Sequence, residues 1–128
     1  MDYSLDVLAV GESLVDLLYR EDETKVFLEG NPGGAPANVL AMLSQLGKKT
    51  ALISAVGNDP FGGFLKTQIA NAKIDTSQML TLDFPTTLAV VSLDKTGNRS
   101  FNFYRNQTAD VMLSPEHISP DSVKSAKI

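Results

Sequence analysis

A glycine pair followed by a proline and an apolar run constrains this chain more than any other stretch. Gly33 and Gly34 lack a Cβ, so the backbone there can adopt positive φ and lie closely against a ligand. Pro36 suits the first turn of a helix, because the amide hydrogen that it lacks would have no partner inside the helix. The sequence therefore predicts a loop that leads into a helix ending near Gly47.

The predicted helix combines apolar side chains with a polar start. Five apolar residues recur at helical spacing: Val39, Leu40, Met42, Leu43 and Leu46. They predict one buried face. The start of the helix offers unpaired amide hydrogens at the positive end of the helix dipole, and Asn38 adds an amide donor and acceptor. Such a site suits a polyol or an anion, but an ordinary tight turn before a core helix explains the glycines equally well.

Composition restricts the partners and the compartment. The 128 residues have room for one domain with one core. The net charge is −4 and Lys and Arg are scattered, so nucleic acid is not an expected partner. The chain has no cysteine and a single histidine, which argues against disulfides and a zinc site. No signal peptide is apparent and no apolar run approaches the ~20 residues of a membrane span, so we expect a cytoplasmic protein without membrane contact.

Short apolar runs alternate with helical patterns. Residues 5–10 and 50–56 each predict a buried strand. A helix is expected over 61–72, with Asn58 or Asp59 as its N-cap. The order strand, helix, strand implies parallel pairing with a right-handed crossover, which places the chain in the α/β class.

A single carboxylate interrupts an apolar run near the N-terminus. Asp16 lies within residues 14–19, whose other members are apolar or aromatic. Burying a carboxylate is costly unless it has a partner. Asp16 therefore either caps a turn or faces water on an edge strand, or it accepts hydrogen bonds from ligand hydroxyls. The charged residues 20–25 predict a turn, and residues 25–29 predict the second strand of a small hairpin.

A second hairpin is expected over residues 87–105. Gly97-Asn98 supplies left-handed turn geometry between its two strands. Phe101 and Phe103 alternate with polar residues, so one face of the hairpin is aromatic. That face either covers a pocket or extends a core. Arg105, at the end of the hairpin, is more typical of a solvated charge at a rim than of a ligand clamp.

Motifs along the whole chain together resemble a known family. They are Gly11-Glu12 with Asp16, Gly33 to Asn38, Gly47, Gly57 to Gly62, and Asp94 to Asp110. These motifs resemble the N-terminal half of the ribokinase-like (PfkB-type) carbohydrate kinases, and fructokinases are the subgroup that they resemble most. One position departs from the family pattern, because Leu40 stands where the signature has a small residue.

The resemblance implies a three-layer α/β/α fold with a β-sheet lid, of which this chain would be the N-terminal part. Residues 1–128 would form part of one sugar kinase domain, with the lid built from about 14–30 and 85–106. The implied activity is phosphorylation of a sugar hydroxyl, with ATP and Mg²⁺ as cofactors of the complete enzyme. The implied partners are a small-molecule sugar and a second copy of the chain, bound through the lid.

The resemblance also implies the residues that bind the sugar. Asp16, Gly33, Gly34 and Asn38 match family positions that hydrogen-bond the sugar. Phe103 and Arg105 match lid residues, and in members that act on acidic sugars the arginine meets a carboxylate. A kinase of 2-keto-3-deoxygluconate is therefore the alternative to a fructokinase.

Two family features are missing from these residues. No run matches Asp-Thr-x-Gly-Ala-Gly-Asp, which carries the family's catalytic base, and no run matches a Walker-type phosphate loop. We therefore expect no catalytic residue and no metal site in this chain, and no activity from residues 1–128 alone. Residues 125–128 resemble the start of a further central strand. The remaining alternatives are a non-catalytic sugar-binding module and a module that dimerises through its lid.

Overall fold

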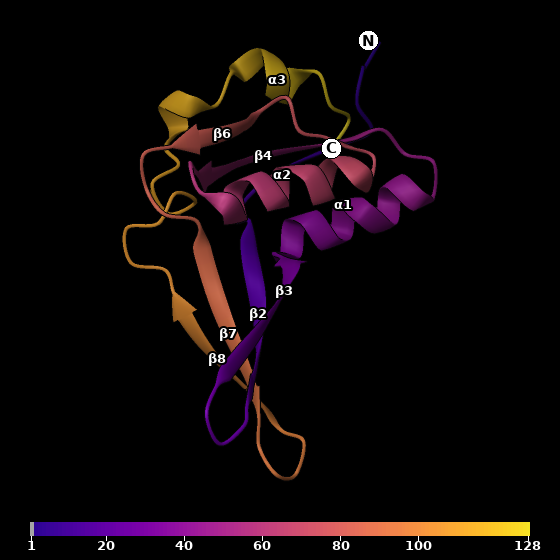
Figure 1. The fold of residues 1–128 in the computed structure, drawn as a ribbon. Helices are drawn as coiled ribbons and strands as arrows, with labels where there is room; N and C mark the ends of the chain where they lie inside the picture. The colour runs from indigo at the N-terminus through magenta and orange to yellow at the C-terminus, as the bar shows by residue number, and fades with distance from the viewer. Residues whose placement is uncertain (1) are drawn as a thin grey trace.

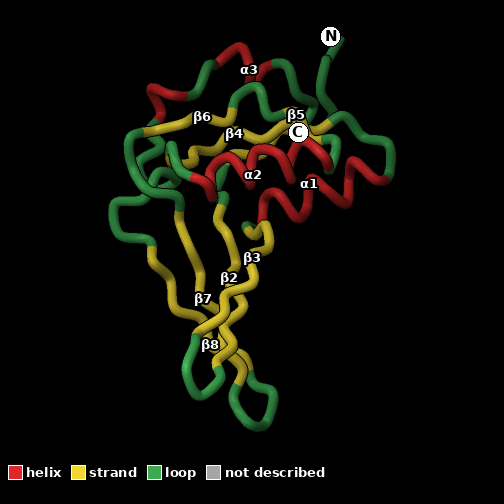
Figure 2. Tube along the Cα trace, in the orientation of Figure 1, coloured by secondary structure: helices red, strands yellow, loops and turns green. Residues whose placement is uncertain are grey.

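The computed structural model describes residues 2–128, which form two β-sheets and the helices around them (Figure 1, Figure 2). The strands of the first sheet are β1 (Val7–Val10), β4 (Thr50–Gly57), β5 (Ile74–Asp75) and β6 (Met79–Leu82). The sheet is parallel throughout, with the order β1-β4-β5 and with β6 also paired to β4. The predicted α/β class and parallel pairing are confirmed.

Two helices pack on the same side of the parallel sheet, and Figure 1 shows them next to each other along β4. They are α1 (Ala35–Gln45) and α2 (Pro60–Asn71), and each has a proline in its first turn, which the sequence predicted for Pro36 of α1. The short helix α3 (Pro120–Lys124) lies on the other side of β4 and β6 in Figure 1. No helix within residues 2–128 is long and apolar enough to cross a membrane.

The second sheet consists of two hairpins joined side by side. Its strands are β2 (Leu14–Glu21), β3 (Val26–Gly33), β7 (Thr87–Leu93) and β8 (Arg99–Tyr104). Their order is β3-β2-β7-β8, and the parallel pairing of β2 with β7 connects the two antiparallel hairpins. In Figure 1 this sheet projects away from the helices and ends in the two hairpin turns.

The first hairpin is longer than the sequence predicted. Residues 30–33 belong to β3 and not to a loop, because they pair in register with β2, where Gly33 faces Leu14. Gly34 alone separates β3 from α1. The helix start is therefore held directly by a strand, which fixes its position more firmly than a loop of several residues would.

One hydrophobic core joins both sheets to the helices. Leu40 of α1, Leu52 of β4 and Leu65 of α2 have no exposed surface. Val15 and Leu17 of the second sheet belong to the same buried cluster. Because complete burial of a leucine side chain stabilises a fold by about 1.5–3 kcal/mol, this shared core fixes the start of the second sheet against the helices.

The predicted apolar face of α1 is wrong in its details. Leu40 is buried together with Ala37 and Ser44. Three of the residues expected inside are exposed to solvent: Val39, Met42 and Leu46. The periodic pattern identified the helix, but apolar residues spread around it, so the pattern did not identify the face that packs on the sheet.

Asp59 ties the start of α2 to the start of β7. Its Oδ1 accepts a hydrogen bond from the Gly62 amide at 2.8 Å, which confirms the predicted N-cap. Its Oδ2 accepts a hydrogen bond from the Thr86 amide at 2.9 Å. These hydrogen bonds lower the pKa of Asp59 against the opposing effect of burial, so the cap is charged at neutral pH.

Residues near the C-terminus pair beside β1. Leu5 and Ala126 form an isolated parallel bridge, and the Leu8 amide donates a hydrogen bond to the Ile128 carbonyl at 2.8 Å. Lys127 forms an ion pair with Asp6 at 2.7 Å. Residues 125–128 thus lie along the edge of β1 that is opposite β4.

Candidate functional site

Asp16 lies on β2 in a row of residues that crosses the second sheet. It pairs with Asn31 on one side and with Ala89 on the other, and Ala89 pairs with Phe103. Paired residues of neighbouring strands share a face of the sheet, so Asp16 and Phe103 lie on the same face. Because β2 lies between β3 and β7, Asp16 neither caps a turn nor lies on an edge strand; hydrogen bonding to ligand hydroxyls remains a prediction.

The Asp16 carboxylate is partly desolvated. Burial raises its pKa above the ordinary value, and no opposing hydrogen bond or positive charge within residues 2–128 lowers it. A carboxylate in this state has unused acceptor capacity, since each oxygen can accept hydrogen bonds. It therefore suits a ligand that brings hydroxyl donors.

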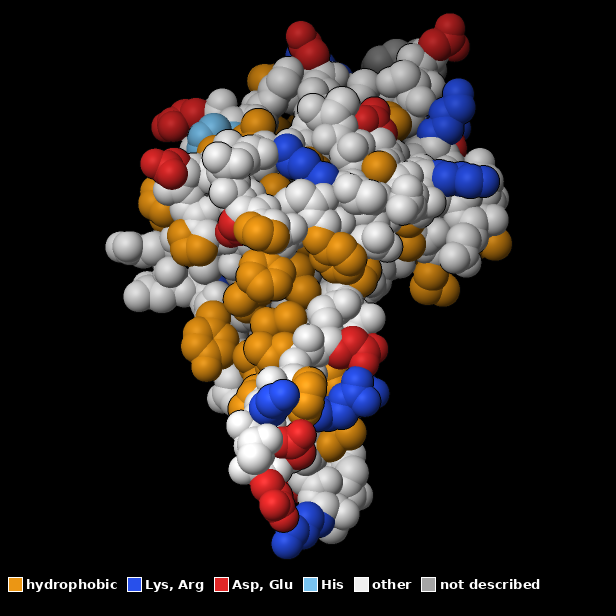
Figure 3. Space-filling view, in the orientation of Figure 1, with side chains coloured by type: hydrophobic (Ala, Val, Ile, Leu, Met, Phe, Trp, Pro, Cys, Tyr) orange, Lys and Arg blue, Asp and Glu red, His pale blue; other side chains and the backbone are white. Residues whose placement is uncertain are grey.

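A cavity of about 280 Å³ adjoins Asp16 on this face. Its lining residues are Asp16, Leu18, Asn31, Val91, Leu93, Arg99 and Phe101. Phe101 stacks on Phe103, with 6.1 Å between the ring centroids. Figure 3 shows the hydrophobic side chains gathered over the second sheet, with charged side chains at its tip.

Gly33 and Gly34 bring the start of α1 against β2. A Cβ on Gly33 would lie 2.6 Å from Oδ2 of Asp16, so the absence of a side chain leaves room for the carboxylate. Gly34 has φ of 113°, and a Cβ there would lie 2.8 Å from the Glu12 carbonyl oxygen. The sequence allowed positive φ at both glycines of this pair; in the structure Gly34 has positive φ and Gly33 does not. The structure places Asp16, Gly33 and Gly34 together.

Replacing Gly34 by Ala is expected to weaken binding of the sugar that the family resemblance implies, and to destabilise the fold by about 1–3 kcal/mol. The added Cβ meets backbone, which cannot rotate away, and φ is unfavourable for alanine. Gly47→Ala is the matched control, because Gly47 also has positive φ but no atom within 4 Å of the added Cβ. Chemical denaturation and titration calorimetry check both variants. Equal effects of the two substitutions would show that close contact at Gly34 does not matter.

The first amides of α1 are less available than the sequence suggested. The Ala35 amide donates a hydrogen bond to Oε1 of Glu12 at 3.2 Å, and Pro36 has no amide hydrogen. The Asn38 backbone amide donates a hydrogen bond to the Gly34 carbonyl at 3.2 Å, whereas the side-chain amide of Asn38 is exposed. Because a carboxylate already lies at this helix terminus, the site favours a neutral polyol over an anion.

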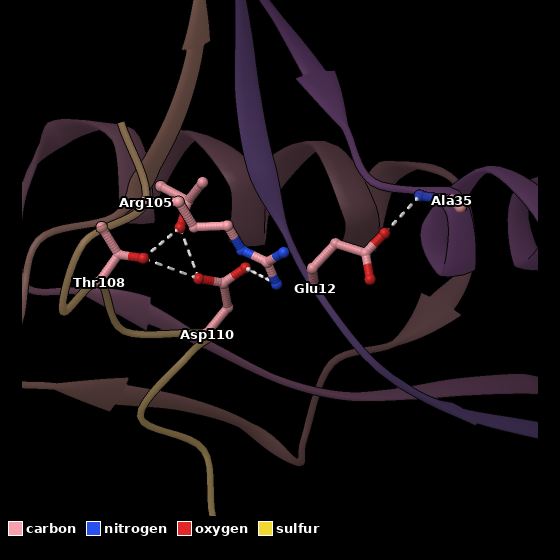
Figure 4. A network of polar contacts seen from close by, with 6 residues as sticks. Glu12, Ala35, Arg105, Thr108 and Asp110 are labelled. Atoms are coloured by element: carbon pink, nitrogen blue, oxygen red, sulfur yellow. Dashed lines mark hydrogen bonds and ion pairs between the residues drawn. The ribbon is translucent and has the colours of Figure 1, made fainter. Parts of the chain in front are cut away.

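Phe103 and Arg105 line a different hollow from the one beside Asp16. This hollow is formed by Pro85, Thr86, Leu88, Phe103, Tyr104, Arg105, Asn106 and Thr108. The structure therefore does not bring Arg105 into the cavity beside Asp16. Arg105 is also not a solvated charge at a rim, because its Nη2 lies 3.2 Å from Oδ2 of the buried Asp110 (Figure 4).

Glu12 and Asp110 lie near the candidate site, and the sequence assigned neither of them a role. Both belong to motifs that carried the family resemblance, but neither has a local pattern that assigns it a role. Their contacts are with residues far along the chain: Glu12 with Ala35, and Asp110 with Thr87 and Arg105. Only the tertiary structure brings these groups together.

Comparisons with known proteins find relatives with similar sequences and similar folds. "Probable fructokinase-2" of Arabidopsis thaliana is 37% identical over 129 residues, which cover 95% of this chain and 39% of the relative. A crystal structure of fructokinase from Xylella fastidiosa superposes with a TM-score of 0.85 at 35% identity, over 94% of this chain and 38% of that one. A structure of the Xylella protein with bound ATP gives a TM-score of 0.82 at 34% identity, over 91% and 38%.

The chain spans about two-fifths of the length of the curated relatives that it matches. The family model described as pfkB family carbohydrate kinase matches residues 4–128, nearly the entire chain. The resemblance inferred from the glycine motifs is thereby confirmed, and the chain belongs to the pfkB family of carbohydrate kinases.

Proposed function

We propose that this chain is the N-terminal, sugar-binding part of an ATP-dependent carbohydrate kinase, and that the sugar is fructose. We refer to the longer protein, in which this part would be joined to the remainder that its relatives carry, as the complete kinase. The observation that carries the proposal is the close approach of the Asp16 carboxylate to Gly33, the last residue of β3, directly before Gly34 and the start of α1. The similarity to proteins named fructokinase supports the choice of sugar.

In this proposal each site residue has a defined role. Asp16 accepts hydrogen bonds from two sugar hydroxyls, and its partial desolvation strengthens them. Gly33 leaves room for the Asp16 carboxylate, and Gly34 lets the start of α1 pack against the Glu12 backbone. The exposed side-chain amide of Asn38 donates and accepts further hydrogen bonds with the sugar. These contacts hold one hydroxyl in a fixed orientation, which is the main contribution of a protein to phosphoryl transfer.

ATP and Mg²⁺ are the cofactors proposed for the complete kinase, in which ATP supplies the phosphoryl group and Mg²⁺ neutralises its charge. Within residues 2–128 no group of three acidic, histidine or cysteine side chains is arranged to hold a metal ion. The residues described therefore do not fit a metal site. We assign the chain the sugar side of the reaction and no catalytic residue.

The second sheet is proposed to act as a lid, built from about residues 14–30 and 85–106, over a three-layer α/β/α body. Four large apolar residues on the face that carries Asp16 are at least half exposed: Phe27, Leu93, Phe101 and Phe103. Such a surface would exclude water from a bound sugar. It would also suit a homodimer in which the lids of two chains pack together.

A second candidate substrate is an acidic sugar such as 2-keto-3-deoxygluconate. The half-exposed guanidinium of Arg105 favours this candidate, because arginine binds carboxylates through a planar pair of donors. The similarity to proteins named fructokinase still favours fructose, whose hydroxyl oxygens can also accept hydrogen bonds from Arg105.

The proposal is tested by sugar-dependent ADP release. The complete kinase is assayed with fructose, ribose and 2-keto-3-deoxygluconate at equal concentrations, and fructose is expected to give the highest kcat/KM. Residues 1–128 alone are expected to give no release above background, because they carry neither the family's catalytic base nor its phosphate-binding motif. If none of the three sugars stimulates ADP release by the complete kinase, the proposal is wrong. A non-catalytic sugar-binding module would instead bind fructose, as measured by calorimetry, without turnover.

A further inference from the structure

Asp110 is a buried carboxylate to which the proposed function assigns no role. It lies in the loop after β8, and its side chain has no exposed surface. The loop is held against the start of β7, because the Ala109 amide donates a hydrogen bond to the Pro85 carbonyl at 2.8 Å. Aspartates are rarely buried to this extent without a partner.

Two threonine hydroxyls orient the Asp110 carboxylate. Oδ1 accepts a hydrogen bond from the hydroxyl of Thr108 at 3.0 Å and another from the hydroxyl of Thr87. Thr87 is itself buried at the first position of β7, so it offers a fixed donor. With Oδ1 held in this way, Oδ2 points to Arg105 (Figure 4).

The Asp110 charge is compensated by Arg105. Oδ2 lies 3.2 Å from Nη2 of Arg105 and has no hydrogen-bond partner among residues 2–128. Breaking such a pair leaves a buried charge without compensation, which is strongly unfavourable. The pairing therefore restrains the long Arg105 side chain, which would otherwise sample many rotamers.

The same contact leaves most of the guanidinium free to bind a ligand. The Arg105 side chain is 44% exposed, and its Nη2 is the nitrogen paired with Asp110. A guanidinium has five N–H donors in a rigid fork. In Figure 4 the guanidinium extends from Asp110 toward Glu12, which holds the start of α1 through its bond to Ala35.

We propose that Asp110 is a positioning residue that fixes the guanidinium of Arg105, so that the free N–H donors of Arg105 face oxygen atoms of the sugar. This inference rests on the proposed function, because it requires that Arg105 contacts the sugar. Thr87 and Thr108 belong to the same device, since they determine which Asp110 oxygen faces Arg105. Asp110 itself does not touch the sugar.

A double-mutant cycle in the complete kinase tests the inference. The variants are Asp110→Asn, Arg105→Met and the double variant, each assayed for the KM and kcat of the preferred sugar. Asp110→Asn keeps the side-chain volume and an acceptor for the threonines. We expect each single substitution to raise KM about tenfold with kcat within about twofold, and the double variant to equal Arg105→Met alone. Asp121→Asn, on the exposed start of α3, is the control and should leave KM unchanged.

Any other outcome of the double-mutant cycle contradicts either the positioning role of Asp110 or the contact of Arg105 with the sugar. If Asp110→Asn lowers Tm but leaves KM unchanged, or raises KM equally with and without Arg105, Asp110 is structural and the inference is wrong. If Arg105→Met leaves KM unchanged while the kinase phosphorylates its sugar, the inference fails but the proposed function stands. Should Asp110→Asn not fold, Thr108→Val removes one orienting donor. It should then raise KM about threefold in the wild-type background and not with Arg105→Met.

Discussion

Asp16→Ala in the complete kinase is expected to lower kcat/KM for fructose about 100-fold, which corresponds to about 2.7 kcal/mol. In the proposed function, the carboxylate supplies charge-assisted hydrogen bonds to sugar hydroxyls in a partly desolvated site, where such bonds are strongest. Steady-state kinetics with fructose and saturating ATP give the value directly. An unchanged kcat/KM would exclude Asp16 from the sugar site.

Asp16→Asn separates the role of the charge from that of the side-chain shape. Burial raises the pKa of Asp16, so the charged form costs the folded protein free energy above that pKa and none when the group is protonated. Removing the charge should therefore leave Tm at pH 7 unchanged or higher, while kcat/KM falls. In the wild type, kcat/KM should fall as the pH drops through the raised pKa of Asp16. A lower Tm for Asp16→Asn at pH 7 would show that the carboxylate has a stabilising partner.

Gly62→Ala is expected to destabilise the complete kinase by about 3 kcal/mol or more. A Cβ on Gly62 would lie 2.0 Å from the Gly57 carbonyl oxygen, where the end of β4 approaches the first turn of α2. Backbone atoms cannot move aside without shifting the helix. That shift would also disturb Asp59, which caps α2 and binds the Thr86 amide before β7.

Gly63→Ala is the matched control for Gly62→Ala. Gly63 is the next residue of α2, is exposed, and has no atom within 4 Å of an added Cβ. Alanine in a helix interior is favoured over glycine by about 0.5–1 kcal/mol, so this variant should be slightly more stable. Urea unfolding at constant pH measures both variants. A similar stability for the two would contradict the close packing of α2 on β4.

Local patterns predicted most elements of the fold. Pro36 in the first turn of α1, the cap at Asp59 and the turn at Gly97-Asn98 act within a few residues, so a single sequence reveals them. The apolar run at 50–56 became β4, which is buried along its whole length. These features depend on backbone conformation and short-range hydrogen bonding, and the tertiary structure did not override them.

Features that depend on distant residues were not predictable. The parallel pairing of β2 with β7 joins residues about seventy positions apart, and no local signal marks it. The buried face of α1 was misassigned, because Val39, Met42 and Leu46 have the same apolar character as Leu40. The ion pair of Arg105 with Asp110 depends on a loop folding back onto β7.

The candidate site was predicted unevenly for the same reason. The glycine motif predicted a close approach at the start of α1, and the structure places Gly33 and Gly34 beside Asp16; that a ligand binds there remains a prediction. The contact between Glu12 and the Ala35 amide, which makes the helix terminus less suited to an anion, required the structure. The placement of Arg105 in a separate hollow also followed from the tertiary structure alone.

A crystal structure of the complete kinase with fructose tests the central claim most directly. We predict that fructose lies beside Gly33 and Gly34 at the start of α1, with two of its hydroxyls within about 3 Å of the Asp16 carboxylate and another near the side-chain amide of Asn38. Fructose bound elsewhere, with the Asp16 carboxylate in contact only with water, would contradict the account.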